Sequence, residues 1–322
     1  MRVSTALMIA LALTVPLCRP GNAAPAPANP SGGAPGSITA GGLERTFRLY
    51  VPPTHDRSRP VPLVIVLHGG GGTGAAMERL TDGGLNRLAA RDGFVVVYPD
   101  GVERHWNDGR GVTDYRAHRE NIDDVGFISA LIDHLARTQG IDRSRVYAAG
   151  ISNGGLFSQR LARELAPRIA AIGVIAISMS DKIALMRVPA RPVSVVLIPG
   201  TEDPLVPWAG GDLGFAGSRR KVGTVLSVAE TVAAWVALNR CAPPPVVTWE
   251  PDRSPQDGTR VRREAYGPCG AGSEVVLYAV QGGGHTWPSG WQYLPERFIG
   301  RTSKDIDANE VLWDFFKKHA IR

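Results

Sequence analysis

The sequence predicts an α/β domain in which a mostly parallel central sheet is covered by helices on both faces. Two observations predict this class. Apolar segments of strand length alternate with amphipathic segments, and no internal repeat or linker interrupts residues 37–322. The apolar segments are continuous, as expected of parallel strands that are buried on both faces. They lie at residues 61–67, 94–98, 169–177 and 193–198. We therefore expect one domain over residues 37–322.

The N-terminal segment is expected to precede this domain. A short basic start leads into an apolar stretch, residues 6–17, that is too short to span a bilayer. Small residues follow, so the pattern predicts a secretory signal peptide over residues 1–23 and an extracellular or periplasmic protein without stable membrane insertion. Lipid anchoring at Cys18 is an alternative, but Leu17 before it is too bulky for a good lipidation site. Residues 24–36, rich in Ala, Pro and Gly, predict a disordered linker.

The remaining elements follow from local periodicity. Alternating apolar and polar residues at 43–51 predict a half-exposed antiparallel strand. Amphipathic segments predict helices at residues 75–90, 125–138, 156–165, 227–239 and 307–319. Apolar and β-branched segments predict further strands at residues 146–149, 246–249, 260–266 and 274–280.

One junction between strand and helix carries a catalytic pattern. The strand that begins at Val146 ends in Gly150-Ile151-Ser152-Asn153-Gly154, and a helix follows at once. Such a Gly-x-Ser-x-Gly turn is a nucleophile elbow, which presents a serine hydroxyl at the end of a sheet in the α/β-hydrolase fold. Gly150 and Gly154 supply the small flanking residues that this strained turn requires. A Gly-rich loop is the alternative, because the chain contains 38 glycines.

The order of residues along the chain selects the base. In this fold the acid and then the histidine follow the serine. After Ser152 the sequence has only His285 and His319. His319 lies at the end of the last predicted helix, where a cation suits the helix dipole. His285 follows a glycine run at the end of a predicted strand, where the sites of open α/β sheets lie, so His285 is the predicted base.

The acid is expected in the loop after the strand at 193–198. Asp203 is the preferred candidate, because Pro204 and Pro207 would make the loop around its carboxylate rigid. Glu202 is the neighbouring alternative, and Asp212 is a weaker one.

An oxyanion hole requires two backbone N–H donors. The residue after the nucleophile, Asn153, supplies one, and the glycine run after the strand at 61–67 supplies the other. Gly70 is the expected second donor, with Gly71 as the alternative. The same glycine run could resemble a phosphate-binding loop, but no Gly-Lys-Ser/Thr sequence follows it and no dinucleotide fingerprint fits.

Charge and cysteine content limit the possible partners. The formal charge of +6 falls to about +4 after removal of the two arginines of the signal peptide, and no basic block is interleaved with aromatic residues. Nucleic-acid binding is therefore not expected. Two cysteines remain, Cys241 and Cys269, and in an oxidising compartment they predict one disulfide, worth about 3 kcal/mol in the chain-entropy model. We expect no metal and no cofactor.

Taken together, these motifs resemble a known family. The chain is similar to secreted polyhydroxybutyrate depolymerase-like and feruloyl esterase-like α/β-hydrolases, grouped in carbohydrate esterase family one. The resemblance covers nearly the whole domain and rests on Leu67-His68-Gly69-Gly70-Gly71, Tyr98-Pro99-Asp100-Gly101, Trp106-Asn107, Asp123-Asp124-Val125-Gly126-Phe127, Arg145-Val146-Tyr147, Gly150 to Gly155, Gly200-Thr201-Glu202-Asp203 and Gly283-Gly284-His285-Thr286-Trp287-Pro288.

The resemblance implies a serine esterase with Ser152, Asp203 and His285 as its triad, and relatives commonly have the Cys241–Cys269 disulfide. The chain departs from the family pattern at Pro199, where a histidine is usual, and at Trp208, where a tyrosine is commoner.

The resemblance leaves the substrate open among hydroxyalkanoate, feruloyl and acetyl esters. Trp106, Trp208 and Trp287, with Trp291, could form an aromatic platform for an acyl or sugar group, and core packing explains them equally well. Residues 286–301 are expected either to form a rim over the site or to be an ordinary surface loop. A peptidase or acyltransferase on the same fold is the main alternative function, and a non-catalytic secreted binding module is the other. The oligomeric state is not predicted.

Overall fold

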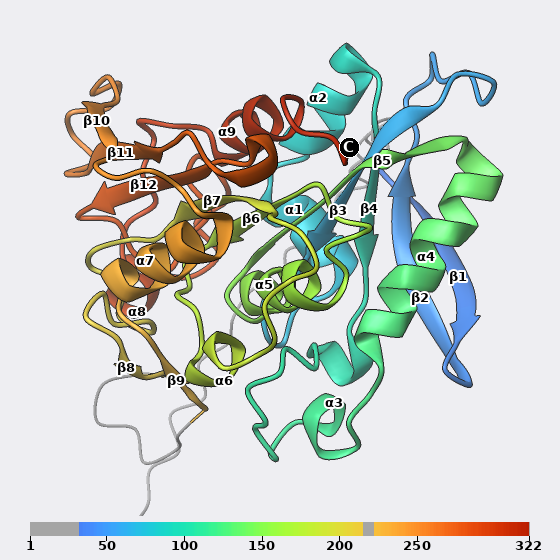
Figure 1. Ribbon diagram of the computed structural model, residues 1–322, viewed down its shortest axis with the longest axis horizontal. Coiled ribbons are helices and arrows are strands. Elements are labelled where there is room, and N and C mark those ends of the chain that lie inside the picture. The colour runs from blue at the N-terminus through green and yellow to red at the C-terminus, as the bar shows by residue number, and fades with distance from the viewer. Residues whose placement is uncertain (1–31, 215–221, 322) are drawn as a thin grey trace, which may run out of the picture. The chain divides into compact units, whose positions relative to one another are not determined.

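The computed structural model describes residues 32–214 and 222–321. In chain order, the strands of its main sheet are β1 (Ala34–Ala40), β2 (Leu43–Tyr50), β3 (Val61–Leu67), β4 (Val95–Pro99), β5 (Ile141–Ile151), β6 (Ala171–Ile175), β7 (Ser194–Ile198), β10 (Val246–Trp249), β11 (Arg260–Tyr266) and β12 (Val275–Gln281). These ten strands have the spatial order β1-β2-β4-β3-β5-β6-β7-β12-β11-β10 (Figure 1). A separate short pair joins β8 (Gly211–Asp212) to β9 (Thr224–Val225).

The sheet is parallel in its centre and antiparallel at its two sides. Strands β4, β3, β5, β6, β7 and β12 pair in parallel, each with its neighbour. Strands β1 and β2 are antiparallel on one side, and β11 and β10 are antiparallel on the other. The prediction of a mostly parallel sheet is confirmed. Its parallel strands carry the loops that build the site.

Helices cover both faces of this sheet (Figure 1). The longer helices are α1 (Gly74–Leu80), α2 (Gly84–Asp92), α4 (Asp124–Gln139), α5 (Asn153–Glu164), α7 (Val228–Asn239) and α9 (Ala308–Phe316). Short helices are α3 (Arg116–Arg119), α6 (Asp181–Ala184) and α8 (Glu296–Ile299), with 3₁₀ turns at Val102–Arg104 and Gly270–Gly272.

The core therefore has two layers. Apolar side chains of α4, α5 and α7 pack on one face of the sheet, and those of α1, α2 and α9 pack on the other. Successive residues of β3 alternate between these layers: Leu63, Ile65 and Leu67 point into one, and Val64 and Val66 into the other. This burial on both faces is why the central strands are apolar throughout.

The helix predicted at residues 75–90 is two helices. The break lies at Asp82 and Gly83, which have φ values of 51° and 62°, outside the helical region. The amphipathic pattern continues across the break because α1 and α2 pack on the same face of the sheet. Periodicity alone therefore could not reveal the interruption.

The predicted signal peptide (residues 1–23), Cys18 within it and the linker up to residue 31 lie outside the described residues. The linker prediction is wrong for its last residues, because residues 34–36 belong to β1, which pairs along its whole length with β2. Just before β1, the Gly33 N–H donates to the buried Glu78 carboxylate at 2.5 Å. Within the described ranges, no helix has the length and apolarity that crossing a bilayer requires.

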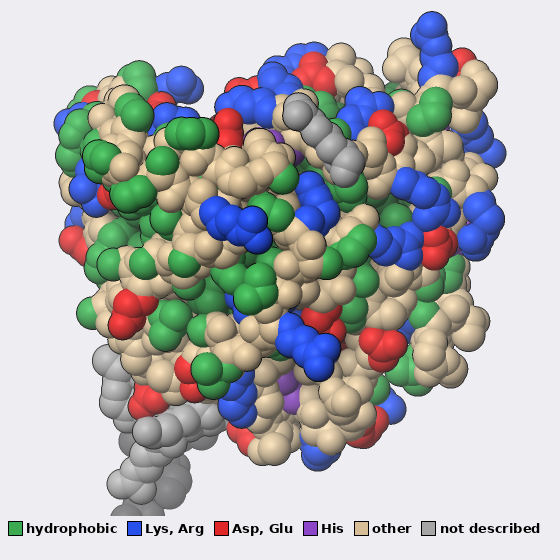
Figure 2. Space-filling view, viewed as in Figure 1, with side chains coloured by type: hydrophobic (Ala, Val, Ile, Leu, Met, Phe, Trp, Pro, Cys, Tyr) green, Lys and Arg blue, Asp and Glu red, His purple; other side chains and the backbone are tan. Residues whose placement is uncertain are grey.

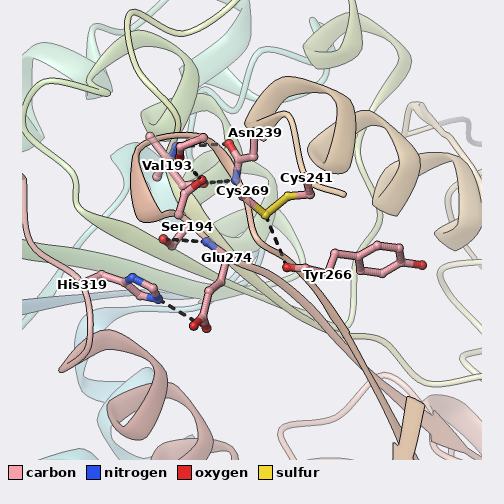
Figure 3. Close-up of a disulfide and its surroundings, with 10 residues drawn as sticks. Val193, Ser194, Asn239, Cys241, Tyr266, Cys269, Glu274 and His319 are labelled. Atoms are coloured by element: carbon pink, nitrogen blue, oxygen red, sulfur yellow. Dashed lines mark hydrogen bonds and ion pairs between the residues drawn. A yellow bond between two sulfur atoms is a disulfide. The ribbon is translucent and has the colours of Figure 1, made fainter. Parts of the chain in front are cut away.

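The predicted disulfide is present. It joins Cys241, just after α7, to Cys269 in the connection between β11 and β12 (Figure 3). Beside it, the Asn239 side chain bonds both the N–H and the carbonyl of Val193 at the start of β7. His319 lies in the same corner, 3.7 Å from Glu274, and burial lowers the pKa of its imidazole. This burial disfavours the cation that the sequence suggested for His319.

Charged side chains are scattered over the visible surface. Figure 2 shows Lys and Arg side chains interspersed with Asp and Glu rather than gathered in one basic patch. On this face the modest positive charge of the chain is therefore dispersed.

Candidate active site

A cavity of about 530 Å³ opens at the carboxyl ends of the parallel strands. Loops that follow β3, β4, β6, β7 and β12 line it, together with the turn between β5 and α5. The structure brings four predicted site residues to this cavity: Gly70, Ser152, Asn153 and His285. The fifth, Asp203, lies directly behind His285.

The turn between β5 and α5 has the geometry of a nucleophile elbow. Ser152 has φ 56° and ψ −121°, a strained conformation for a residue with a side chain, and it caps the start of α5. The strain is held by the packing of the turn against β3: a Cβ atom on Gly154 would lie only 2.3 Å from the Leu67 carbonyl oxygen. The glycine is therefore required by the close approach of the two backbones.

An acid and a histidine that are far apart in the sequence meet at the cavity that Ser152 also lines. His285 Nδ1 lies 2.7 Å from Asp203 Oδ2, and both side chains are buried. The other oxygen of Asp203 accepts from the backbone N–H groups of Leu205 and Val206, at 2.8 and 2.9 Å. These bonds orient the carboxylate, so Nδ1 carries the proton that it donates to Asp203. Asp203, not Glu202, bonds the histidine.

The segment after β12 holds His285 by its backbone. The His285 N–H donates to the Ile299 carbonyl at 2.5 Å, and the Gly284 N–H donates to the Arg301 carbonyl at 3.0 Å. The Tyr293 hydroxyl donates to the His285 carbonyl at 3.0 Å. Tyr293 and Trp291 also line the cavity, so residues 286–301 do form a rim over it. The sequence indicated this rim as one of two alternatives but did not indicate the role of Tyr293.

The two expected oxyanion donors lie beside the serine. The Asn153 N–H is in the first turn of α5, where backbone N–H groups have no partner within the helix. In the β3 loop, the Gly71 N–H is already used, because it donates to the Arg104 carbonyl at 2.8 Å. Among the described residues the Gly70 N–H has no such carbonyl partner. The geometry therefore favours Gly70 over the alternative, Gly71.

The Asn153 side chain has a separate, structural task. Its Oδ1 accepts from the Trp106 N–H at 2.8 Å, and its Nδ2 donates to the buried Asp108 carboxylate at 2.6 Å. These bonds fasten the loop after β4 to the elbow. The sequence predicted a role only for the backbone N–H of Asn153. The side-chain bond joins residues 47 positions apart and therefore leaves no local pattern.

His68 fixes the loop that contains Gly70. Its Nδ1 donates to the Gly69 carbonyl at 2.8 Å, and its Nε2 accepts from the Gly101 N–H at 3.0 Å. Burial lowers the pKa of His68 to about 4, so the ring is neutral at pH 7. The Nδ1 bond thus holds the ring within the β3 loop, and the Nε2 bond joins this loop to the segment after β4. The sequence included His68 only as part of a motif.

Of the two alternatives for the tryptophans, a platform or core packing, three of the four residues take core packing. Trp106 and Trp287 are fully buried and donate to the His68 carbonyl and the Asn309 side chain. Trp208 packs against the core and does not line the cavity. Only Trp291, the fourth tryptophan considered, lines the cavity, with 58% of its surface exposed. Tryptophan side chains occur in cores as well as in pockets, and the sequence alone could not distinguish the two locations.

Other polar residues at the cavity were not predicted. His105, Arg110 and Tyr115, all from the loop after β4, are among the residues that line it. Their segment is polar and irregular in sequence and carries no periodic signal. In the parts of the chain that the structure describes, no group of three or more His, Cys, Asp or Glu residues could hold a metal ion.

Comparison with known proteins identifies the family. Residues 45–201 match the family described as Esterase PHB depolymerase. The putative esterase NocK of Nocardia uniformis subsp. tsuyamanensis is 33% identical over 285 residues, which cover 86% of this chain and 80% of that protein. The chain belongs to the esterase PHB depolymerase family. It is accordingly a carboxylic ester hydrolase.

Two further relatives of this PHB depolymerase-family esterase have named activities. Feruloyl esterase B of Piromyces equi is 29% identical over 219 residues, covering 65% of this chain and 38% of that protein. The bifunctional acetylxylan esterase/xylanase XynS20E of Neocallimastix patriciarum is 26% identical over 280 residues, covering 87% of this chain and 34% of that protein. The matched regions thus span little more than a third of these two longer proteins.

Solved structures agree with the α/β-hydrolase fold. The acetyl xylan esterase from Aspergillus awamori superimposes with a TM-score of 0.52 at 16% identity, covering 79% of this chain and 94% of that one. A thermostable esterase gives a TM-score of 0.52 at 15% identity, covering 89% of this chain and 62% of that one. At these identities the likeness is one of fold.

Proposed function

We propose that this esterase works through an acyl-enzyme intermediate, with Ser152 as nucleophile, His285 as general base and Asp203 as the residue that orients the base. The observation that carries the proposal is the 2.7 Å contact between His285 Nδ1 and Asp203, at a cavity that Ser152 also lines. Because Nδ1 donates to the carboxylate, Nε2 is free to accept a proton.

The reaction has two balanced halves. His285 Nε2 takes the Ser152 hydroxyl proton while Oγ attacks the ester carbonyl carbon. The tetrahedral intermediate collapses, the bond to the alcohol oxygen breaks, and the alcohol leaves with the proton from His285. Water then attacks the acyl-enzyme, its proton passing through His285 to Ser152 Oγ as the acid departs.

The Gly70 and Asn153 N–H groups stabilise the negative charge that develops on the carbonyl oxygen. Both belong to rigid backbone, so little reorganisation is needed when the charge forms. A single donor of this kind typically contributes about 100- to 1000-fold in rate. The dipole of α5, whose N-terminus begins at Asn153, adds to the same effect.

We propose hydroxyalkanoate, feruloyl or acetyl esters as the substrate class. The cavity, about 530 Å³, has the size of a small-molecule site. Leu205, Val206 and Leu213 are among its lining residues, and such apolar side chains suit an acyl chain. The feruloyl and acetylxylan activities that the two relatives' names carry support the same class.

We also propose that the protein is exported, through the signal peptide predicted over residues 1–23. The Cys241–Cys269 disulfide supports an oxidising compartment. Mass spectrometry of the exported protein is expected to give a mature N-terminus at Ala24. An N-terminus at Met1 would contradict export by cleavage.

The test is single-turnover acylation with p-nitrophenyl acetate and butyrate, methyl ferulate and a hydroxybutyrate oligomer. We expect a burst on at least one ester that disappears in Ser152→Ala. Ser58→Ala is the matched control, since this exposed serine bonds Asp56 on a surface loop and does not line the cavity, and it should retain the burst. No acylation of any ester, or a burst that persists in Ser152→Ala, would refute the mechanism.

A further inference from the structure

Polar as well as apolar side chains line the cavity. His105, Arg110 and Tyr115 are among the polar ones and all come from the loop after β4, and Leu205 and Leu213 are among the apolar ones. The proposed mechanism assigns no task to these three polar residues. Their hydrogen-bonding groups therefore raise the question of what part of a substrate they contact.

Arg110 presents a donor that none of the described residues uses. Its side chain is only 7% exposed, with Nε donating to Asp108 and Nη1 to the Val222 carbonyl, each at 2.8 Å. Two fixed nitrogens hold the planar guanidinium in one orientation. Within the described residues its third nitrogen, Nη2, has no hydrogen-bond partner. Nη2 thus remains a donor for a group in the cavity.

His105 presents an acceptor. Its Nδ1 lies 3.0 Å from the Glu103 carbonyl oxygen, which can only accept, so Nδ1 carries the proton and Nε2 has the lone pair. Burial lowers the pKa of His105, which keeps the ring neutral. The ring stacks on Tyr115 with centroids 3.9 Å apart, and its Nε2 edge lies against Gly70. The acceptor is therefore next to the proposed oxyanion donor.

The charges around Arg110 argue for a neutral ligand. Asp108 already neutralises the guanidinium through a buried ion pair. His118 lies 3.6 Å from Asp108, and burial lowers its pKa, so it adds no second cation. A carboxylate ligand would be repelled by the lone pair of His105 Nε2 and by the negative charge of Asp108. A hydroxyl group, in contrast, both accepts and donates, and so satisfies Arg110 and His105 together.

We propose that Arg110 and His105 form a subsite for a hydroxyl group of the substrate and make the enzyme selective for hydroxyl-bearing esters. This inference rests on the proposed function, because it places the subsite beside the reacting carbonyl. The hydroxyl can belong to the acyl group or to the alcohol. The hydrogen bonds to the hydroxyl are the same in both cases, and matched pairs of substrates distinguish an acyl hydroxyl from an alcohol hydroxyl.

The experiment compares kcat/KM within pairs of esters that differ by one hydroxyl. Methyl 3-hydroxybutyrate against methyl butyrate tests the acyl side, and 2-hydroxyethyl butyrate against ethyl butyrate tests the alcohol side. Monomethyl succinate tests a carboxylate. We expect the hydroxyl to raise kcat/KM about tenfold or more in one pair, because a site built to hydrogen-bond a hydroxyl rejects the analogue that lacks it.

Two variants test the assignment to these residues. His105→Phe keeps a ring for stacking on Tyr115 but removes the acceptor, and Arg110→Lys keeps a cation beside Asp108 but removes the planar donor. Each is expected to lower the hydroxyl preference to near one. His55→Phe is the matched control: His55 bonds the Gln139 carbonyl and does not line the cavity, so the preference should persist.

Each outcome supports or overturns the proposal. Plain esters hydrolysed with no hydroxyl preference in either pair would overturn the subsite and leave the esterase mechanism standing. A hydroxyl preference that is retained in a folded His105→Phe variant would also overturn the subsite. Fastest turnover of monomethyl succinate would indicate an anion site instead. No hydrolysis of any ester would overturn the proposed function itself, and this inference with it.

Discussion

Two loops of this molecule each hold a histidine next to a glycine run, and they use it differently. His68 begins the loop after β3, and His285 lies in the loop after β12; both side chains are nearly inaccessible, at 1% and 4% exposure. Their sequence contexts are near mirror images, His-Gly-Gly in one and Gly-Gly-His in the other. Neither burial nor local sequence distinguishes them.

Their ring partners do distinguish them. Both nitrogens of His68 bond backbone groups, which leaves the ring no proton to exchange with a substrate. His285 bonds a carboxylate through Nδ1 and lines the cavity with the rest of its ring. The comparison teaches that a buried histidine is suited to proton transfer when one nitrogen remains available, as we propose for His285, whereas one with both nitrogens bonded serves the structure.

The largest expected effect is on kcat, and it tests whether His285 and His68 differ in role. His285→Gln should lower kcat by about 10⁵-fold or more, because His285 is the proposed base and its removal would abolish activation of the nucleophile. His68→Gln should lower kcat by about tenfold at most, since the Gln amide can still donate to a carbonyl and accept from an N–H. Steady-state kinetics on the best ester checks both. Comparable losses in the two variants would contradict the division of roles.

The second prediction concerns stability, where His68 should matter more. Burial holds the pKa of folded His68 at about 4, against about 6.5 in the unfolded chain. Between these values the unfolded state binds the proton and the folded state does not, so stability is complete above pH 6.5 and falls as pH decreases towards 4. The difference of about 2.5 pKa units corresponds to about 3 kcal/mol.

Urea unfolding between pH 7 and 4 measures this loss. The decrease in unfolding free energy should be smaller by about that amount in His68→Gln than in the unsubstituted protein. Other buried histidines with lowered pKa values, such as His118 and His319, act in the same direction but are present in both proteins. Parallel curves for the two proteins would show that His68 does not titrate in this way.

The comparison also shows what sequence can reveal. Central strands and the elbow were predictable because their signals are local: an apolar segment, then Gly-x-Ser-x-Gly, then an amphipathic helix. His285 was selected by chain order, since few histidines follow Ser152. Asp203 could only be preferred over Glu202, because the bond that distinguishes them spans 82 positions.

What sequence could not reveal depends on distant contacts. The first residues of strand β1, Ala34, Pro35 and Gly36, are weak strand formers, and they belong to the strand because they pair with β2. Trp106 and Trp287 could be assigned either to the pocket or to the core, because a tryptophan side chain suits both. Their places were decided by Phe157, on which Trp106 stacks, and by Asn309, which Trp287 bonds.

The smallest expected effect concerns how the loop after β12 holds the backbone of His285. The Tyr293 hydroxyl donates to the His285 carbonyl at 3.0 Å, and burial raises the pKa of this phenol, so it stays a donor at all ordinary pH values. Tyr293→Phe removes the bond and leaves the carbonyl without it, a loss of about 1 kcal/mol. If that loss acts on the placement of His285, kcat should fall about fivefold while KM changes little.

Tyr266→Phe is the matched control. Its hydroxyl bonds Glu264 on the antiparallel side of the sheet, away from the cavity lining, so kcat should be unchanged even if thermal stability decreases slightly. A purely structural role for Tyr293 would give the same pattern, with a lower melting temperature and unchanged kcat. A lower kcat in Tyr293→Phe alone would instead show that the loop after β12 positions its histidine through a hydroxyl, whereas the loop after β3 positions His68 through backbone groups.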